Sequence, residues 1–322
     1  MTADDVYIAT KAAIIEMIKT GTTVFCGGYL FPEAVFKACN EVGFPAFIGI
    51  TISDRENRWS SSAKEALLKS EKLLKSYNNE VARFILSPYS IYNCSEDTLA
   101  RVAFLAEKYD TYVQMHVAET RWECVDCWKK TKKWPIEYLE SIGFLSWRVI
   151  LAHSAWLTKM EIPIIARNKC KVVHCPTSNM KLASGATMPL PELLGEGIEV
   201  MLGTDSPASN NSLNMMTEMK FASLAHKAHR WDASVMKHGT VLDMASTWNK
   251  SMLKHADAIT VRKTDVSIRP WHDLGANIVY SGAHVEDVFI NGKPAMLDGK
   301  MLVMDEDQVL DEFERTAEKF RA

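Results

Sequence analysis

The stretch Gln114-Met-His-Val-Ala-Glu-Thr120 ends a short apolar run with a histidine and, three residues later, a glutamate. Two later stretches have the same form, Leu151-Ala-His-Ser154 and Leu202-Gly-Thr-Asp205, and a helix-like segment follows each of the three. Parallel βα units gather the exits of their strands at one edge of the sheet. We therefore expect two imidazoles and two carboxyl groups, distant in sequence, to meet at that edge.

Working outward from these stretches, we find seven buried-type strand patterns separated by helical patterns at intervals of roughly 25–30 residues, as βα units require. The predicted strands are residues 22–26, 46–52, 81–86, 111–117, 148–152, 171–175 and 199–202. Right-handed crossovers in this order predict an α/β fold, a parallel sheet wound into a (β/α)8 TIM-type barrel. Because the first pattern is a helix, Asp4 to Thr20, the first strand of the barrel is the missing one.

The pattern changes after residue 229, which predicts a second unit. We expect the barrel in residues 1–255 and a small β appendage with a closing helix in residues 256–322. Helices are predicted over residues 233–253 and 308–320, and strands over 256–261 and 276–302. Asn291-Gly292 and Asp298-Gly299 are hairpin turn signals within the appendage.

Composition limits the possible partners and locations. The 322 residues are 47% apolar and 24% charged, with a net charge of −3, so neither nucleic acid nor a membrane is expected as a partner. Seven scattered cysteines do not form a disulfide framework and indicate a reducing, cytoplasmic setting. No targeting signal is visible, and no apolar run approaches bilayer length.

Each candidate side chain also has a structural interpretation. His116 and His153 could be hydrogen-bonded core histidines, and Asp205 could close an Asx turn. Asn211 already serves as a plausible helix cap, which leaves Asp205 available for chemistry. Their shared position at strand exits makes a chemical role for the group the better interpretation, because imidazole and carboxylate are the ligand types of hydrolytic zinc sites.

Other polar motifs are given structural roles. His174 is expected to be structural or to line the pocket, and Cys124-Val-Asp-Cys127 to lie on a solvated helix surface. His226, His229 and His238 are expected on the polar surface.

The segments Val172 to Gly185, Pro189 to Leu194 and Leu202 to Asn211 resemble the amidohydrolase superfamily. Within it they are most similar to the 5-methylthioadenosine/S-adenosylhomocysteine deaminases and the triazine chlorohydrolases. The resemblance covers nearly the whole chain and implies a metal-dependent deaminase of an aminated purine nucleoside or a related N-heterocycle. The cofactor would be one divalent metal per active site, zinc by preference, and the partner a small-molecule substrate.

The resemblance also assigns roles to residues. It implies that His116 and Asp205 bind the metal and that Asp205 takes a proton from the attacking water. Glu119 would protonate the heterocycle, and His153 would orient the water or the developing oxyanion. Ser209 and Tyr89 would line the substrate pocket.

Two departures from the family keep a second function open. The His-x-His pair of the family's first strand does not occur in these 322 residues. Where the family reads Pro-His-Ser/Ala-Pro-Tyr, this chain has Pro88-Tyr-Ser-Ile-Tyr92. The alternative is therefore a truncated, non-catalytic paralogue that acts as a binding or partner subunit.

An incomplete barrel also predicts association. The strands at 22–26 and 199–202 would have open edges, and open edges invite pairing. We expect a homo-oligomer or a chain that supplies the missing strand; an N-terminal extension would have the same effect.

Overall fold

The computed structural model describes residues 1–76, 79–248 and 256–320 and shows a curled parallel sheet of α/β type. Its strands are hydrogen-bonded in the order of the chain. They are β1 (Phe25–Tyr29), β2 (Ala46–Ile52), β3 (Ala82–Pro88), β4 (Val113–Val117), β5 (Val149–His153), β6 (Lys171–His174) and β7 (Val200–Leu202). The predicted fold class is confirmed, as a half-barrel that β1 and β7 border in the described part of the chain.

The curl of the sheet follows from its inner side chains. Cys26 on β1 and Gln114 on β4 have two strands between them, yet the Cys26 thiol donates to the Gln114 Oε1 across 3.1 Å. Apolar side chains from four strands form a second small core there, namely Phe47, Ile85, Ile150 and Met201. A flat sheet could not bring such side chains together, so the concave face is a packed interior.

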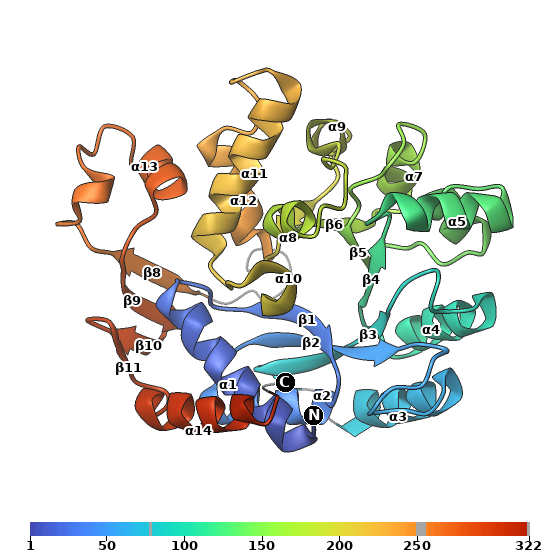
Figure 1. Ribbon diagram of the computed structural model, residues 1–322, viewed down its shortest axis with the longest axis horizontal. Helices are drawn as coiled ribbons and strands as arrows, with labels where there is room; N and C mark the ends of the chain where they lie inside the picture. Colours follow the sequence, from blue (N-terminus) through green and yellow to red (C-terminus); the bar gives the residue numbers. More distant parts are fainter. Residues whose placement is uncertain (77–78, 249–255, 321–322) are drawn as a thin grey trace.

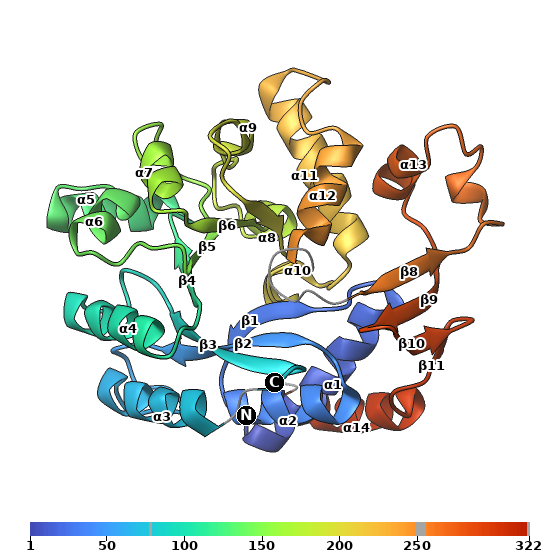
Figure 2. The same ribbon diagram turned by 180° about the vertical axis from the view of Figure 1, so that it is seen from behind.

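Helices surround the convex face of the sheet (Figures 1 and 2). They are α1 (Ala3–Lys19), α2 (Pro32–Val42), α3 (Ala63–Ser76), α4 (Glu96–Lys108), α5 (Arg121–Thr131), α6 (Pro135–Ser141), α7 (Ile162–Arg167), α9 (Leu190–Gly195), α11 (Met215–Arg230) and α12 (His238–Trp248). Within the described residues, none of the helices is both long and apolar enough to cross a membrane. The sequence also predicts a helix over residues 61–77; its last residue, and residues 249–253 of the helix predicted over 233–253, lie outside the described residues.

Two short helices follow the last two strands of the sheet and were not predicted. They are α8 (Pro176–Lys181) after β6 and α10 (Pro207–Asn210) after β7, and each has proline in its first turn. Proline fits there because the first helical N–H groups have no intrahelical acceptor. Both helices lie at the strand exits, where the candidate side chains are.

The appendage is a four-stranded antiparallel sheet with the order β11-β10-β9-β8. Its elements are β8 (Ala258–Val261), a 3-10 turn (Val266–Ile268), α13 (Leu274–Ser281), β9 (Val285–Ile290), β10 (Lys293–Leu297) and β11 (Lys300–Met301). The predicted strand from residue 276 was wrong over α13. There Asp273 accepts from the backbone N–H of Ala276 at 2.9 Å and begins a helix, which Gly282 ends.

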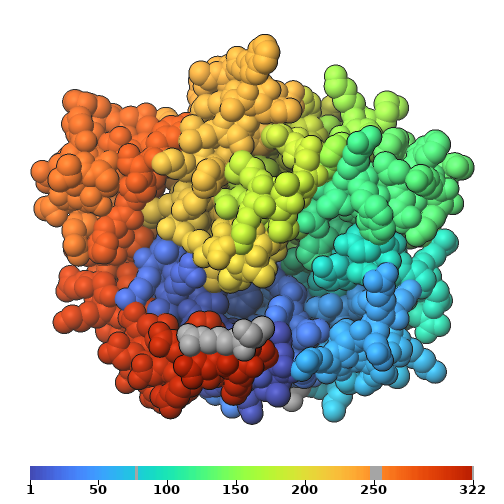
Figure 3. Space-filling model, in the orientation of Figure 1, coloured from blue at the N-terminus to red at the C-terminus, as the bar shows by residue number. Residues whose placement is uncertain are grey.

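The closing helix α14 (Glu306–Glu318) packs against α1, so the two ends of the described chain lie together (Figure 3). Val309 of α14 lies in a small core with Ile8 and Ile15 of α1. Asp5 and Lys319 form an ion pair at 2.9 Å. The division at residue 255 remains a prediction. α1 contacts the barrel helix α2 and also the appendage, so the two predicted units share an interface.

Candidate active site

The strand exits bring the predicted side chains to one edge of the sheet. His116 of β4 and His153 of β5 stack with their ring centroids 5.3 Å apart. Asp205 follows β7, and Tyr89 follows β3 with its ring centroid 5.0 Å from that of His116. Residues that are 116 positions apart in the chain therefore belong to one site, as parallel βα units predict.

The hydrogen bonds of His116 determine which ring nitrogen is free. Its Nδ1 lies 2.9 Å from the carbonyl oxygen of Tyr89, and a carbonyl can only accept. Nδ1 therefore carries the proton, and the lone pair of Nε2 is available. A backbone carbonyl on one ring nitrogen is the usual arrangement behind a histidine that ligates a metal through the other.

Glu119 lies on a tight turn that the side chain of Glu123 holds. Ala118 has a φ of 52°, and the backbone N–H groups of Ala118 and Glu119 donate to the Glu123 carboxylate at 2.8 and 2.9 Å. Burial raises the pKa of Glu123 to about 7. Glu123 was not predicted, although the spacing Thr120-Arg-Trp-Glu123 is a capping-box signal.

His153 is fully buried and pairs with Glu119. Its Nε2 lies 3.9 Å from Glu119 Oε2, while its Nδ1 faces the amide nitrogen of Asn179 at 3.2 Å. An amide nitrogen donates, so Nδ1 accepts and the proton is on Nε2, toward Glu119. Burial lowers the pKa of His153, which keeps the ring neutral near pH 7.

Asp205 is fixed by three hydrogen bonds. Ser178 and Ser209 donate to its Oδ2 at 2.7 and 2.6 Å, and the Ser206 N–H donates to Oδ1 at 2.7 Å. Burial opposes ionisation, but the bonds from Ser209 and Ser178 hold the pKa of Asp205 below its ordinary value. Asp205 is therefore an ionised acceptor with a set orientation.

Ser209 is buried, with its hydroxyl on Asp205, so we propose that it positions Asp205 rather than the substrate. Asn210 supports the same loop: its amide donates to the Thr204 carbonyl and to Glu218, each at 2.7 Å. Ser178, Asn179 and Glu218 were not among the predicted site residues. Ser178, Asn179 and Asn210 lie inside the stretches that carried the family resemblance.

Tyr89 is 41% exposed and borders the site. Burial raises the pKa of Tyr89, and the negative charges of Glu119 and Asp205 act in the same direction. Its predicted contact with substrate remains a proposal.

The residues present fit a divalent metal only in part. His116 offers a free Nε2 and Asp205 an ionised carboxylate, both suitable donors. Zinc in a hydrolytic site takes about three protein ligands. Within residues 1–76, 79–248 and 256–320, however, no three histidine, cysteine, aspartate or glutamate side chains are grouped to hold a metal. The described residues alone do not complete the set.

Two expectations about other polar residues were wrong. His226 is buried and not on the polar surface, with its Nε2 3.1 Å from Nε2 of His174, because α11 places it toward β6. Burial lowers the pKa of His226 to about 4. Cys124 and Cys127 are also buried, since they lie on the inner side of α5. His174 is buried beside His226, and its expected role, structural or pocket-lining, stays a prediction.

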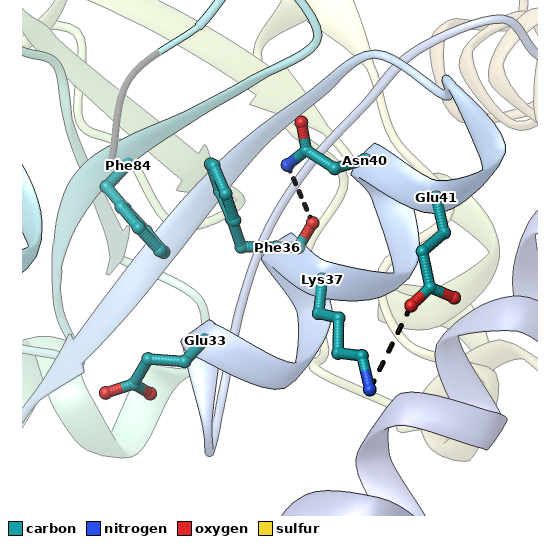
Figure 4. A pocket seen from close by; sticks show the side chains of 6 residues that line it. All are labelled: Glu33, Phe36, Lys37, Asn40, Glu41 and Phe84. Atoms are coloured by element: carbon teal, nitrogen blue, oxygen red, sulfur yellow. Dashed lines mark hydrogen bonds and ion pairs between the residues drawn. The ribbon is translucent and has the colours of Figure 1, made fainter. Parts of the chain in front are cut away.

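A cavity of about 400 Å³ lies elsewhere, and Figure 4 shows the side chains that line it. These come from α2 and from β3: Glu33, Phe36, Lys37, Asn40, Glu41 and Phe84. The rings of Phe36 and Phe84 stack 5.1 Å apart, and Lys37 pairs with Glu41 at 3.9 Å. The cavity has no strand-exit side chain and is not part of the candidate site.

Comparison with known proteins agrees with this geometry. A model of the amidohydrolase family matches residues 1–259. The chain belongs to this family. A 5-methylthioadenosine/S-adenosylhomocysteine deaminase from Thermodesulfovibrio yellowstonii is a similar amidohydrolase, 33% identical over 337 residues that cover 98% of this chain and 75% of the relative.

Solved amidohydrolase structures are similar over the whole sheet. An adenosine deaminase from Xanthomonas campestris with bound zinc has a TM-score of 0.96 and 28% identity, covering 100% of this chain and 76% of that one. An atrazine chlorohydrolase from Arthrobacter aurescens in complex with zinc has a TM-score of 0.91 at 19% identity, covering 98% and 77% of the two chains, which shows the fold alone. The predicted resemblance is confirmed.

Proposed function

We propose that this amidohydrolase is a hydrolytic deaminase of an adenosine-like nucleoside. The observation that carries the proposal is the arrangement of Glu119, the Nε2 proton of His153 and the ionised Asp205 around one strand-exit edge. Relatives with adenosine-type substrates in their names support the substrate class. No comparison supports the alternative of a non-catalytic paralogue.

The proposed reaction uses two carboxyl groups in turn. Water adds its oxygen to the ring carbon that bears the amine, and Asp205 takes one water proton while Glu119 gives one to the ring nitrogen. The neutral His153 donates a hydrogen bond from Nε2 to the oxygen of the attacking water. Asp205 then protonates the amine, which leaves as ammonia, and Glu119 recovers a proton from the new hydroxyl as the carbonyl forms.

A divalent metal, zinc by preference, would lower the pKa of the attacking water when bound. His116 and Asp205 would hold it, and we propose that the remaining ligands come from another segment or a partner chain. On this basis the described chain binds zinc weakly. Stoichiometric zinc that survives dialysis against a mild chelator would contradict this. The seven unpaired cysteines support a reducing, cytoplasmic location.

The function is tested by incubating the purified protein and zinc with adenosine and with methylthioadenosine, and by measuring ammonia. We expect ammonia and the hydroxylated purine in equal amounts, and none with Asp205→Asn. Absence of ammonia with every adenosine-type nucleoside would refute the deaminase proposal. Metal content by atomic absorption, measured on the same samples, separates a lack of metal from a wrong reaction.

A further inference from the structure

Trp156 lies in a turn that is bonded to the turn of Glu119. It follows His153, the last residue of β5, by three positions and is partly buried. Its backbone N–H donates to the Ala118 carbonyl at 2.9 Å. Ala118 has a φ of 52° and directly precedes Glu119. The backbone of Trp156 therefore ties the exit of β5 to the exit of β4, where the two proposed proton-transfer side chains lie.

The indole of Trp156 holds the loop that follows α8. Its Nε1–H donates to the Ser184 carbonyl at 2.7 Å. Gly185 passes against the same ring, because a Cβ at this position would lie 3.2 Å from Cζ2 of Trp156. Gly185 also has a φ of 88°, which favours glycine. The indole therefore supplies both a hydrogen-bond donor to this loop and the surface against which the loop packs.

The same loop leads back to His153. The Ser184 N–H donates to the Asn179 carbonyl at 2.9 Å, and the Asn179 side-chain amide donates to the Ser184 hydroxyl at 3.4 Å. The amide nitrogen of Asn179 also faces Nδ1 of His153 at 3.2 Å. This contact places the His153 proton on Nε2, toward Glu119. A chain of contacts thus runs from the Trp156 indole through Ser184 and Asn179 to the imidazole.

We propose that Trp156 is a positioning residue for the deaminase reaction, and that its indole N–H fixes the tautomer of His153 through Asn179. The inference rests on the proposed function and adds a residue to it. Ser184 is buried, so water does not replace a lost indole donor in place, and the loop must move to satisfy the Ser184 carbonyl. Asn179 is bonded to that loop and moves with it, which breaks its contact with His153.

Trp59 provides a matched control for the same chemical change. Its side chain is buried, and its indole N–H donates to Oε2 of Glu33 at 3.1 Å. Glu33 lines the cavity of Figure 4, which is not part of the candidate site. Trp→Phe at either position removes one indole donor and keeps an aromatic ring. Only at Trp156 does the lost acceptor connect to a side chain of the site.

The test reads the tautomer of His153 directly, so it does not depend on turnover. Long-range ¹H–¹⁵N NMR spectra of protein with ¹⁵N-labelled histidine are recorded for the wild type, Trp156→Phe and Trp59→Phe, with kcat, KM and the melting temperature. In Trp156→Phe we expect the two ring-nitrogen shifts of His153 to approach each other as the second tautomer becomes populated. kcat should fall about tenfold, with KM little changed. Trp59→Phe should lower the melting temperature and leave the shifts and kcat unchanged.

Gly185→Ala tests the same loop with the indole intact, since its methyl group would press on the Trp156 ring and move the loop. It should change the His153 shifts in the same direction as Trp156→Phe. Wild-type His153 shifts in both variants would overturn the proposal, even if both melt earlier, and so would an equal change in Trp59→Phe. Changed shifts in a protein that releases no ammonia from any adenosine-type nucleoside would support the positioning role and count against the deaminase reaction, so the two proposals fail separately.

Discussion

At the scale of single residues, the site histidines divide into two kinds. His116 and His153 each have one ring nitrogen held by a neighbour and the other directed to the site. His174 has Nε2 against His226 in a buried pair. The first two can take part in chemistry, whereas the pair contributes packing.

This division predicts the effect of substitutions on turnover. Asp205→Asn and His116→Ala should lower kcat by about a thousandfold or more, since each loses a proton acceptor or a ligand. His174→Ala should be much milder for kcat but should lower the melting temperature, because it leaves a cavity beside His226. Steady-state kinetics and thermal melts of the three variants check this. Equal loss of turnover in all three would contradict the division.

The raised pKa of Glu123 predicts that the stability of the protein depends on pH. The unfolded chain loses this proton near pH 4.5, whereas the folded protein keeps it to about pH 7 because of burial. Between these values the folded state binds more protons, so its free energy of unfolding falls as pH rises. Relative to Glu123→Gln, the wild type should lose about 3 kcal/mol from pH 4.5 to pH 7.5.

Urea unfolding of both proteins across this pH range measures the effect. The lowered pKa values of His153 and His226 make the free energy of unfolding rise with pH, opposite to the effect of Glu123. Both histidines are also present in Glu123→Gln, so their contribution cancels in the difference between the two proteins. A difference between the two proteins that does not change with pH would mean that Glu123 is ionised in the folded state.

The sequence predicted the residues that sit directly on strand exits and missed those that support them. His116, Glu119, His153 and Asp205 stood out because an ionisable group after an apolar run is unusual. Ser178 and Asn179 make their contacts with residues 27 and 26 positions away. No local pattern encodes such a partner, because it exists only once α8 is placed beside two strands.

At the scale of elements, α8 is one turn and a half long yet holds two site residues. Ser178 reaches Asp205 after β7, and the adjacent Asn179 reaches His153 on β5. α8 thus couples the orientation of an imidazole to that of a carboxylate from a different strand.

Asn179→Asp should invert the tautomer of His153. A carboxylate accepts where the amide donated, so the proton should move to Nδ1 and leave Nε2 bare toward Glu119. We expect a loss of turnover of about a hundredfold or more and an exchange of the two ring-nitrogen shifts in ¹⁵N NMR spectra. Ser184→Ala removes the other, 3.4 Å contact of Asn179 and serves as the control, with the wild-type tautomer retained. Wild-type shifts in Asn179→Asp would refute the assignment.

Strands between turn residues and long helices were predictable from the sequence, whereas the short apolar segment of α13 was not. The runs at 46–52 and 149–153 lie between turn residues and are buried as strands. The apolar run of α13 is similar in composition, yet the Asp273 cap makes it helical. A run of five or six apolar residues suits either structure, so capping and tertiary packing decide.

At the scale of the whole molecule, β1 and β7 each pair with one strand in the described part of the chain. Edges of this kind favour association with a further strand. We predict that the protein has a solution mass above the 36.2 kDa of one chain, measured by light scattering. Tyr29→Lys, at the half-exposed end of β1, should weaken the association, because a lysine on an edge strand opposes pairing.

Leu68→Lys is the control for this change, since it adds the same charge at an exposed position of α3. A monodisperse monomer with low binding of a hydrophobic dye would contradict the prediction. It would mean that α1 or the appendage already covers the open side of the half-barrel.

The contact between α1 and α14 has a consequence for how the protein is made. Each strand of the sheet pairs with the one synthesised just before it, so the half-barrel can assemble while the ribosome is still at work. Ile8 and Ile15 are different, because their partner Val309 is about 300 residues away. Synthesis at about 5–20 residues per second needs on the order of 15–60 s to reach α14 after α1 has been made. During that time Ile8 and Ile15 lack the apolar contact that Val309 later provides.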